Sequence, residues 1–199
     1  MILEGVVTTV ATDGAINVAP MGPVVEPPVP GRDLERFVLR PFRTAQTYAN
    51  LKAHGEGVLH VTDDVLLLAR AAVGRLAPLP ALAAAARVRG WVLRDACRYY
   101  EFRVAACDDS EERAEIDAEV VHAGRLRDFF GFNRAKHAVV EAAILATRTA
   151  LLPAEEVAAE YRKLAVLVEK TGGPREHEAF ALLHRHVRRE AEARRSPAV

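Results

Sequence analysis

Residues 17–30 read NVAPMGPVVEPPVP, which begins with strand-forming residues and then runs into prolines and a glycine. A turn signal, Thr-Asp-Gly, stands at residues 12–14, and residues 2–11 before it are rich in valine and threonine. This pattern predicts a β-hairpin. Proline has no N–H group to donate to a sheet, so we expect the second strand to stop at Pro20. An irregular loop is then expected through residue 33.

Outward from this hairpin, the chain changes from strand patterns to helix patterns. Further strands are expected at residues 34–39, 57–62, 88–94, 98–107 and 116–122. Helices are expected at residues 44–54, 63–73, 133–151, 154–171 and 175–195. We therefore predict an α+β chain with a β-rich domain over residues 1–128 and a C-terminal domain of three helices over residues 129–199.

The composition limits the class of protein. The 199 residues contain 27 acidic and 27 basic side chains, and 50% of the residues are hydrophobic, which is typical of a globular protein. Balanced charge provides no general attraction to nucleic acid or anionic lipid, and no apolar run is long enough to span a membrane. Cys97 and Cys107 lack the spacing of metal or redox sites. We expect a cytoplasmic protein that binds neither nucleic acid nor membranes.

The sequence RPFRTAQT at residues 40–47 is the first candidate binding site. Arg40 and Arg43 come just before a helix that is expected to begin near Thr44, with this residue as its N-cap. Cations are unfavourable at a helix N-terminus unless an anion offsets them. One interpretation is a phosphate site made by the arginines, the hydroxyls of Thr44 and Thr47, and the first N–H groups of the helix. The other is an ordinary N-cap with solvated arginines.

The sequence FFGFNRAKHAVV at residues 129–140 places bases in the first turn of an apolar helix. The bases are Arg134, Lys136 and His137, and Asn133 is positioned to cap the helix. Either these bases pair with acids elsewhere, or they contact an anion or a substrate. The three phenylalanines of this stretch either pack on a planar ring or belong to the core.

The sequence HVTDD at residues 60–64 is a third candidate. Paired carboxylates can hold a metal or act in acid–base catalysis, but Asp63 and Asp64 also stand where a helix favours capping acids. His60 lies inside a strand and is either a packed residue or a ligand. His184 and His186 are two residues apart and do not share a helix face. We therefore predict no metal site.

Several blocks of the sequence occur in a recognisable order: ILEGVVTT, DGAINVAPMGP, LRPFRTAQTYANL, GEGVLHVTDDVLLLARAA and FFGFNRAKHAVVEAAILATR. Over roughly residues 1–180 they resemble the DUF447 family of archaeal and bacterial flavoproteins. The resemblance implies an FMN-binding split β-barrel followed by a helical region. The chain is also similar to flavin reductase-like split barrels, which carry Asn-x-x-Pro and Thr-x-x-Asn motifs, here residues 17–20 and 47–50. It departs from them at Gly22, where the commonest reductases have serine.

The resemblance also implies the location of the cofactor. The FMN phosphate would be held by the start of the first helix, at Arg40, Arg43, Thr44, Gln46 and Thr47. The isoalloxazine ring would lie along the loop and the strand at Pro20, Met21, Gly22, His60, Val61 and Thr62. Further cofactor contacts are expected from the second basic turn, at Asn133, Arg134 and Lys136.

Split barrels of this type usually dimerise, so the resemblance implies a homodimer with FMN near the subunit interface. The second basic turn would then come from either subunit. Its His137 is the candidate for a proton donor or a substrate anchor. The reaction expected is that of an FMN-dependent oxidoreductase of flavin reductase-like type, acting on an unknown small molecule. The alternatives are a non-catalytic flavin-binding or regulatory module, and a partner-binding protein without flavin.

Overall fold

The computed structural model describes residues 1–27 and 33–195, and the chain forms two compact units. The first contains Met1–Thr62 and Pro78–Phe129, and the second contains Asp63–Ala77 and Phe130–Val199. The second boundary lies close to the expected division after residue 128. Residues 63–77, which we placed in the β-rich domain, group instead with the helices. Residues 28–32 of the expected loop lie outside the described residues.

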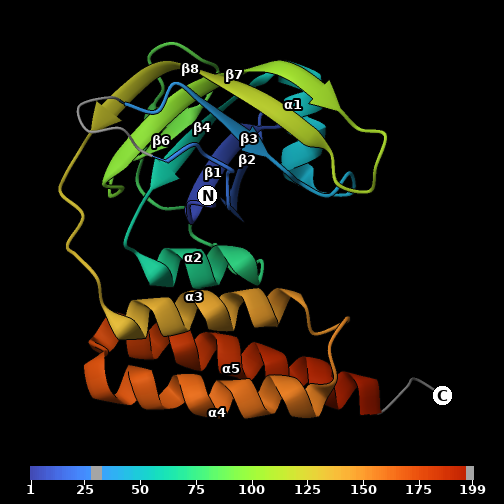
Figure 1. The fold of residues 1–199 in the computed structure, drawn as a ribbon, viewed down its shortest axis with the longest axis vertical. Coiled ribbons are helices and arrows are strands. Elements are labelled where there is room, and N and C mark those ends of the chain that lie inside the picture. Colours follow the sequence, from blue (N-terminus) through green and yellow to red (C-terminus); the bar gives the residue numbers. More distant parts are fainter. Residues whose placement is uncertain (28–32, 196–199) are drawn as a thin grey trace. The chain divides into compact units, whose positions relative to one another are not determined.

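The first unit is built on a six-stranded antiparallel sheet with the strand order β2-β1-β4-β7-β8-β3 (Figure 1). Its strands are β1 (Gly5–Val10), β2 (Ile16–Met21), β3 (Arg36–Leu39), β4 (Glu56–Val61), β7 (Arg98–Asp108) and β8 (Glu115–Arg125). The unit also contains the helix α1 (Gln46–His54) and a two-stranded sheet of β5 (Leu82–Ala84) and β6 (Trp91–Leu93). The strand expected at residues 88–94 is therefore shorter, and β5 was missed because residues 75–86 show no clear periodicity.

The predicted hairpin of β1 and β2 is confirmed, but its expected end at Pro20 is wrong. Pro20 pairs with Val6 and Met21 pairs with Gly5, so β2 continues through the proline. The reason is that β2 is the outer strand of the sheet. An outer strand has one side without a ladder, and proline is tolerated there.

The chain rejoins the sheet immediately after this strand. Val24 forms isolated bridges with both Ile2 and Val38. The bridge to Val38 has both backbone bonds, with N···O distances of 2.8 and 2.9 Å. The residues just before β1 are thereby linked through Val24 to β3, which is the opposite outer strand.

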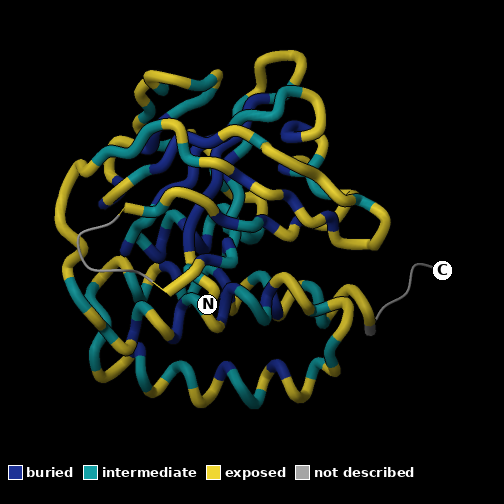
Figure 2. The backbone as a smooth tube through the Cα atoms, turned by 45° about the horizontal axis from the view of Figure 1, so that its top comes forward, coloured by how far each residue is buried: buried dark blue, intermediate teal, exposed yellow. Residues whose placement is uncertain are grey.

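The core of the first unit lies on one face of the sheet, around Leu39, Leu59, Phe102 and Ile116. The Phe37 and Phe102 rings pack edge to face, with centroids 5.1 Å apart. All residues of β1 are buried, and Figure 2 shows buried segments both among the strands and along the helices.

Up to residue 195, the second unit contains the three helices expected after residue 129 and also α2, which comes from residues 63–77. They are α2 (Val65–Ala72), α3 (Arg134–Thr147), α4 (Ala154–Thr171) and α5 (Pro174–Arg195). The buried face of α3 is mostly alanine, at positions 135, 138, 142, 143 and 146, and it packs in one core with α2, α4 and α5. In the described parts of the chain, no helix combines the length and the apolarity that a membrane span requires.

Candidate functional site

The two motif segments of the first unit meet at the hydroxyl of Thr9. The Asn17 side-chain amide donates to Thr9 Oγ1 (3.2 Å) and to Thr47 Oγ1 (3.0 Å), and the Asn50 amide donates to Thr9 Oγ1 (2.9 Å). Gln46 Nε2 in turn donates to Asn50 Oδ1 at 2.6 Å. This network joins β1, β2 and α1, so it holds α1 against the hairpin of β1 and β2.

The network changes the expected roles of two site residues. Thr47 is only 2% exposed, so its side chain lies inside the protein rather than at an open phosphate site. Gln46 is bonded to Asn50. Thr9 was missed by the sequence reasoning, since a buried threonine in a valine-rich strand gives no local sign that two distant amides converge on it.

The helix α1 begins without a capping side chain. Its N-cap is Ala45 rather than the expected Thr44, and among the described residues no side chain accepts from the first N–H groups. The first turn also contains no acid. Unsatisfied N–H groups and the helix dipole give this end a partial positive charge, which favours a bound anion. The predicted end of this helix at Gly55 is confirmed, because Gly55 is the C-cap of α1 with a φ of 65°.

An open hollow of about 390 Å³ lies at this helix start, lined by Arg43, Thr44, Tyr48 and Glu112. Arg43 and Thr44 are exposed, so both can meet a ligand. Arg40 does not line the hollow. Its guanidinium forms an ion pair with Glu115 at 2.8 Å. The structure thus brings two of the five expected phosphate residues together at one cavity.

The far wall of the hollow comes from the connection between β7 and β8. Arg43 N donates to the Glu112 carbonyl (3.1 Å), and Ala114 N donates to the Pro41 carbonyl (3.0 Å). The Arg113 guanidinium lies 3.9 Å from the centroid of the Phe42 ring. These contacts hold the connection against the segment that leads into α1.

A second group of contacts holds the same connection to α1 itself. Asp109 accepts a hydrogen bond from Tyr48 Oη (2.5 Å) and another from Lys52 Nζ. These two donors hold the pKa of Asp109 at about 2, and the Asp109 carboxylate raises the pKa of Tyr48. Sequence reasoning missed Tyr48, Asp109 and Glu112. The available signal was the run of acids DDSEE at residues 108–112.

The expected ring-binding segment lies at the end of β2. Pro20 and Met21 are half-buried, and Met21 packs against the core of the first unit. A Cβ atom on Gly22 would lie 2.8 Å from Ile2 Cγ2. A side chain at this position would therefore require Ile2, which is 63% exposed, to shift.

His60 is a packed residue, so the interpretation of its side chain as a ligand is wrong. It is fully buried, and its Nδ1 lies 3.1 Å from the Val6 carbonyl. Its Nε2 accepts from Leu93 N at 3.0 Å. Burial lowers the pKa of His60 to about 4, so the imidazole is neutral. The following residues Val61 and Thr62 are half-buried.

Glu101 is a second buried ionisable residue of this unit. Its carboxylate is fully buried and accepts from Ala86 N (2.8 Å) and Arg87 N (2.5 Å). A buried carboxylate requires such donors. Glu101 therefore holds the segment between β5 and β6 onto the sheet.

In the second unit, the basic turn is largely structural. Asn133 Oδ1 accepts from Lys136 N (3.1 Å), which caps α3, and Asn133 Nδ2 donates to the Thr171 carbonyl (3.0 Å). Lys136 Nζ donates to the Asp63 carbonyl (2.6 Å) and lies 3.2 Å from Glu176. Of the two interpretations, pairing with acids elsewhere describes Lys136.

The other residues of this turn are exposed. Arg134 and His137 face solvent, and the His137 ring stacks on Phe132 with a centroid distance of 6.0 Å. Phe130 and Phe132 are 89% and 94% exposed, so the interpretation of these two rings as core residues is wrong.

The acids Asp63 and Asp64 accept hydrogen bonds from backbone N–H groups of the second unit. Asp64 caps α2 by accepting from Leu66 N and Leu67 N, both at 3.1 Å. Asp63 accepts from Phe130 N at 3.1 Å. Over residues 1–27 and 33–195, no group of three or more His, Cys, Asp or Glu side chains is arranged to hold a metal ion.

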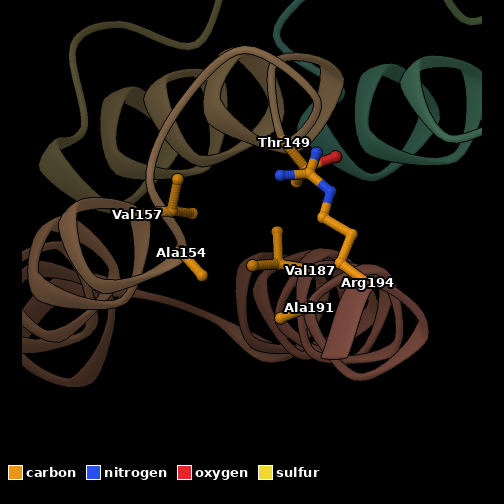
Figure 3. A pocket seen from close by; sticks show the side chains of 6 residues that line it. All are labelled: Thr149, Ala154, Val157, Val187, Ala191 and Arg194. Carbon is orange, nitrogen blue, oxygen red and sulfur yellow. The ribbon is translucent and has the colours of Figure 1, made fainter. Parts of the chain in front are cut away.

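The second unit contains a hollow that cannot hold a cofactor. Its volume of about 10 Å³ is at the lower limit for one water molecule. Figure 3 shows the side chains that line it: Thr149, Ala154, Val157, Val187, Ala191 and Arg194.

Two models of one family match consecutive parts of the chain. The family model described as "Protein of unknown function (DUF447) N-terminal domain" matches residues 3–127. The model described as "Protein of unknown function (DUF447)" matches residues 133–185. None of the curated proteins compared with the chain matches it in sequence.

Solved structures show the same fold. An FMN-bound protein of Methanosarcina mazei with the DUF447 family model superposes with a TM-score of 0.78, at 24% identity, over 93% of this chain and 94% of that one. The 2-nitrobenzoate 2-nitroreductase of Pseudomonas fluorescens reaches 0.52, at 19% identity, over 61% and 64% of the two chains. The flavin reductase of styrene monooxygenase from Pseudomonas putida S12 reaches 0.51, at 13% identity, over 62% and 79%.

Proposed function

Since the chain belongs to the DUF447 family, we propose that it is an FMN-binding flavoprotein and an oxidoreductase of flavin reductase-like type. The observation that carries the proposal is the start of α1, which lacks a capping side chain and opens onto a hollow lined by Arg43 and Thr44. The FMN-bound relative and the flavin reductases of similar fold support flavin as the ligand.

We also propose that the six-stranded sheet is a split β-barrel. The support is the double bridge of Val24 to Ile2 and Val38, which links the two sides of the sheet. A closed sheet has fewer unpaired edges, and it forms a rigid base for a binding site.

The phosphate of FMN would be held by the first N–H groups of α1, the Arg43 guanidinium and the Thr44 hydroxyl. Arginine suits this role because its planar group presents several donors to phosphate oxygens. Thr47, Gln46, Asn50 and Asn17 would act by holding α1 in place. Flavin, when bound, supplies the transfer of hydride or electrons, while the protein binds and orients it.

The remaining expectations stay proposals that rest on the family. They are a flavin ring along residues 20–22 and beside residues 60–62, a homodimer with FMN near the subunit interface, and a cytoplasmic location. In the second basic turn, the internal contacts of Asn133 and Lys136 leave Arg134 and His137 as the exposed groups. His137 remains our candidate for a proton donor or substrate anchor.

A non-catalytic flavin-binding module is the second candidate function. It is favoured by His60 and Glu101, two buried ionisable groups of the first unit that are engaged in bonds to the backbone. Stopped-flow reduction by NADH and NADPH distinguishes the two functions. Reduction and reoxidation over many turnovers support an oxidoreductase, whereas tight FMN binding without turnover by any donor supports the module.

The binding proposal is tested by titrating FMN into the purified chain and following absorbance and flavin fluorescence. We expect Arg43→Ala to weaken FMN binding by at least about tenfold, since it removes a charged phosphate contact worth about 1.5–3 kcal/mol. Arg36→Ala, an exposed arginine on β3, is the matched control. A colourless protein that takes up no added FMN contradicts the proposal. If Arg43→Ala and Arg36→Ala weaken FMN binding equally, the phosphate is not held by Arg43.

A further inference from the structure

The connection between β7 and β8, residues 109–114, is attached to the chain on both sides of the start of α1. On the side before the helix, Arg43 N donates to the Glu112 carbonyl at 3.1 Å, and Ala114 N donates to the Pro41 carbonyl at 3.0 Å. These bonds join backbone atoms. The first attachment therefore does not depend on which side chains the connection carries.

The second attachment depends on one side chain, that of Asp109. Its carboxylate accepts from Tyr48 Oη at 2.5 Å and also from Lys52 Nζ. Tyr48 and Lys52 are four residues apart, so they share one face of α1, and Tyr48 also lines the hollow. Along the chain, Thr44 and the first N–H groups of α1 lie between the two attachments.

The charge of Asp109 and its bonds have opposite effects on an anion at this site. Lys52 and Tyr48 are the main causes of the low pKa of Asp109, and the Arg43 charge lowers it further. By charge alone, a carboxylate that interacts with Arg43 weakens the attraction of Arg43 for a phosphate, so its removal would strengthen binding. By geometry, the same carboxylate holds Tyr48 and α1 in place, so its removal would weaken binding.

The relative strength of these interactions favours the geometric effect. The ion pair of Asp109 with Lys52 is partly exposed, with 31% and 54% of the two side chains accessible, and such pairs contribute little. Charge effects at the surface are screened in the same way. The bond from the Tyr48 hydroxyl to the carboxylate is charge-assisted, which makes it about twice as strong as a neutral hydrogen bond.

We propose that Asp109 is a positioning residue of the phosphate site, which acts through Tyr48 to hold the start of α1 in the geometry that binds the anion. The inference rests on the proposed function. The phosphate itself would be bound by Arg43, Thr44 and the first N–H groups of the helix, and Asp109 would not touch it.

Isothermal titration calorimetry with FMN and with riboflavin, which lacks the phosphate, tests this inference. Asp109→Ala and Tyr48→Phe should each weaken FMN binding by about threefold to tenfold, because each removes the charge-assisted bond. Riboflavin binding should change by less than about twofold, since a positioning effect at the phosphate site does not reach a ligand without phosphate. Tyr48→Phe keeps the ring at the hollow and changes no charge.

Glu111→Ala is the matched control, because Glu111 is an exposed acid of the same connection that does not line the hollow. It should change FMN binding by less than about twofold. If Asp109→Ala binds FMN as tightly as Glu111→Ala does, or if both flavins are weakened alike in Asp109→Ala and Tyr48→Phe, the inference is refuted while FMN binding stands. If the wild-type chain binds no FMN, the proposed function itself fails.

Discussion

Protonation of His60 should destabilise the first unit in a defined pH range. Its pKa is about 4 in the folded protein, against 6.5 for an ordinary histidine. Between these values the unfolded chain binds more protons than the folded protein, so the free energy of unfolding falls as the pH decreases. The full difference corresponds to about 3 kcal/mol, of which about 2 kcal/mol is lost by pH 5. Above pH 6.5 this contribution is complete.

The assay is urea unfolding at pH 8 and pH 5, followed by the fluorescence of Trp91. This is the single tryptophan, and it lies on β6, two residues before the Leu93 amide that His60 accepts from. His60→Gln should flatten the pH dependence by about 2 kcal/mol. His122→Gln, at a half-buried histidine of the same sheet, is the matched control. An equal pH dependence in the wild type and His60→Gln would refute the assignment of a buried neutral imidazole.

Two further predictions concern the first unit. Glu101→Gln should lower the free energy of unfolding by about 1.5–3 kcal/mol, because one buried N–H group then faces an amide donor instead of a carboxylate oxygen. Urea unfolding measures this loss of stability. An equal loss in Glu119→Gln, which changes an exposed acid on β8, would contradict the prediction. Asn17→Ala should weaken FMN binding by about threefold to tenfold and cost about 1–2 kcal/mol of stability, since its hydrogen bonds to Thr9 of β1 and to Thr47 of α1 are lost. Unchanged FMN affinity in a destabilised Asn17→Ala variant would show that the network does not position the phosphate site.

Local sequence signals were sufficient where an element depends on its neighbours in the chain. The turn at residues 12–14 produces the predicted hairpin, and Gly55 ends α1 in the left-handed conformation. Asn133 caps α3 as predicted. Each of these depends on backbone geometry and hydrogen bonds within a few residues, which the residue types determine directly.

The errors arise where a local rule depends on a distant partner. A proline such as Pro20 ends a central strand but not an outer one, and β2 is outermost because it pairs with β1 on one side and with no other described strand on the other. The bases of the second turn looked suited to an anion, yet Lys136 lies 3.2 Å from Glu176, forty residues later in the chain. Residue type alone does not show whether a charge is already paired.

The sequence by itself determined the family, the α+β class and the arginine and threonine that begin the candidate phosphate site. Arg43 and Thr44 are neighbours, so their joint presence at a helix start is a local property. Only the tertiary structure decided that Thr47 is turned into the protein and that Glu112 joins the lining. The physical reason is that Glu112 reaches the hollow through the pairing of β7 with β8 and through backbone bonds to residues 41 and 43. These long-range contacts have no counterpart in the local pattern of the chain.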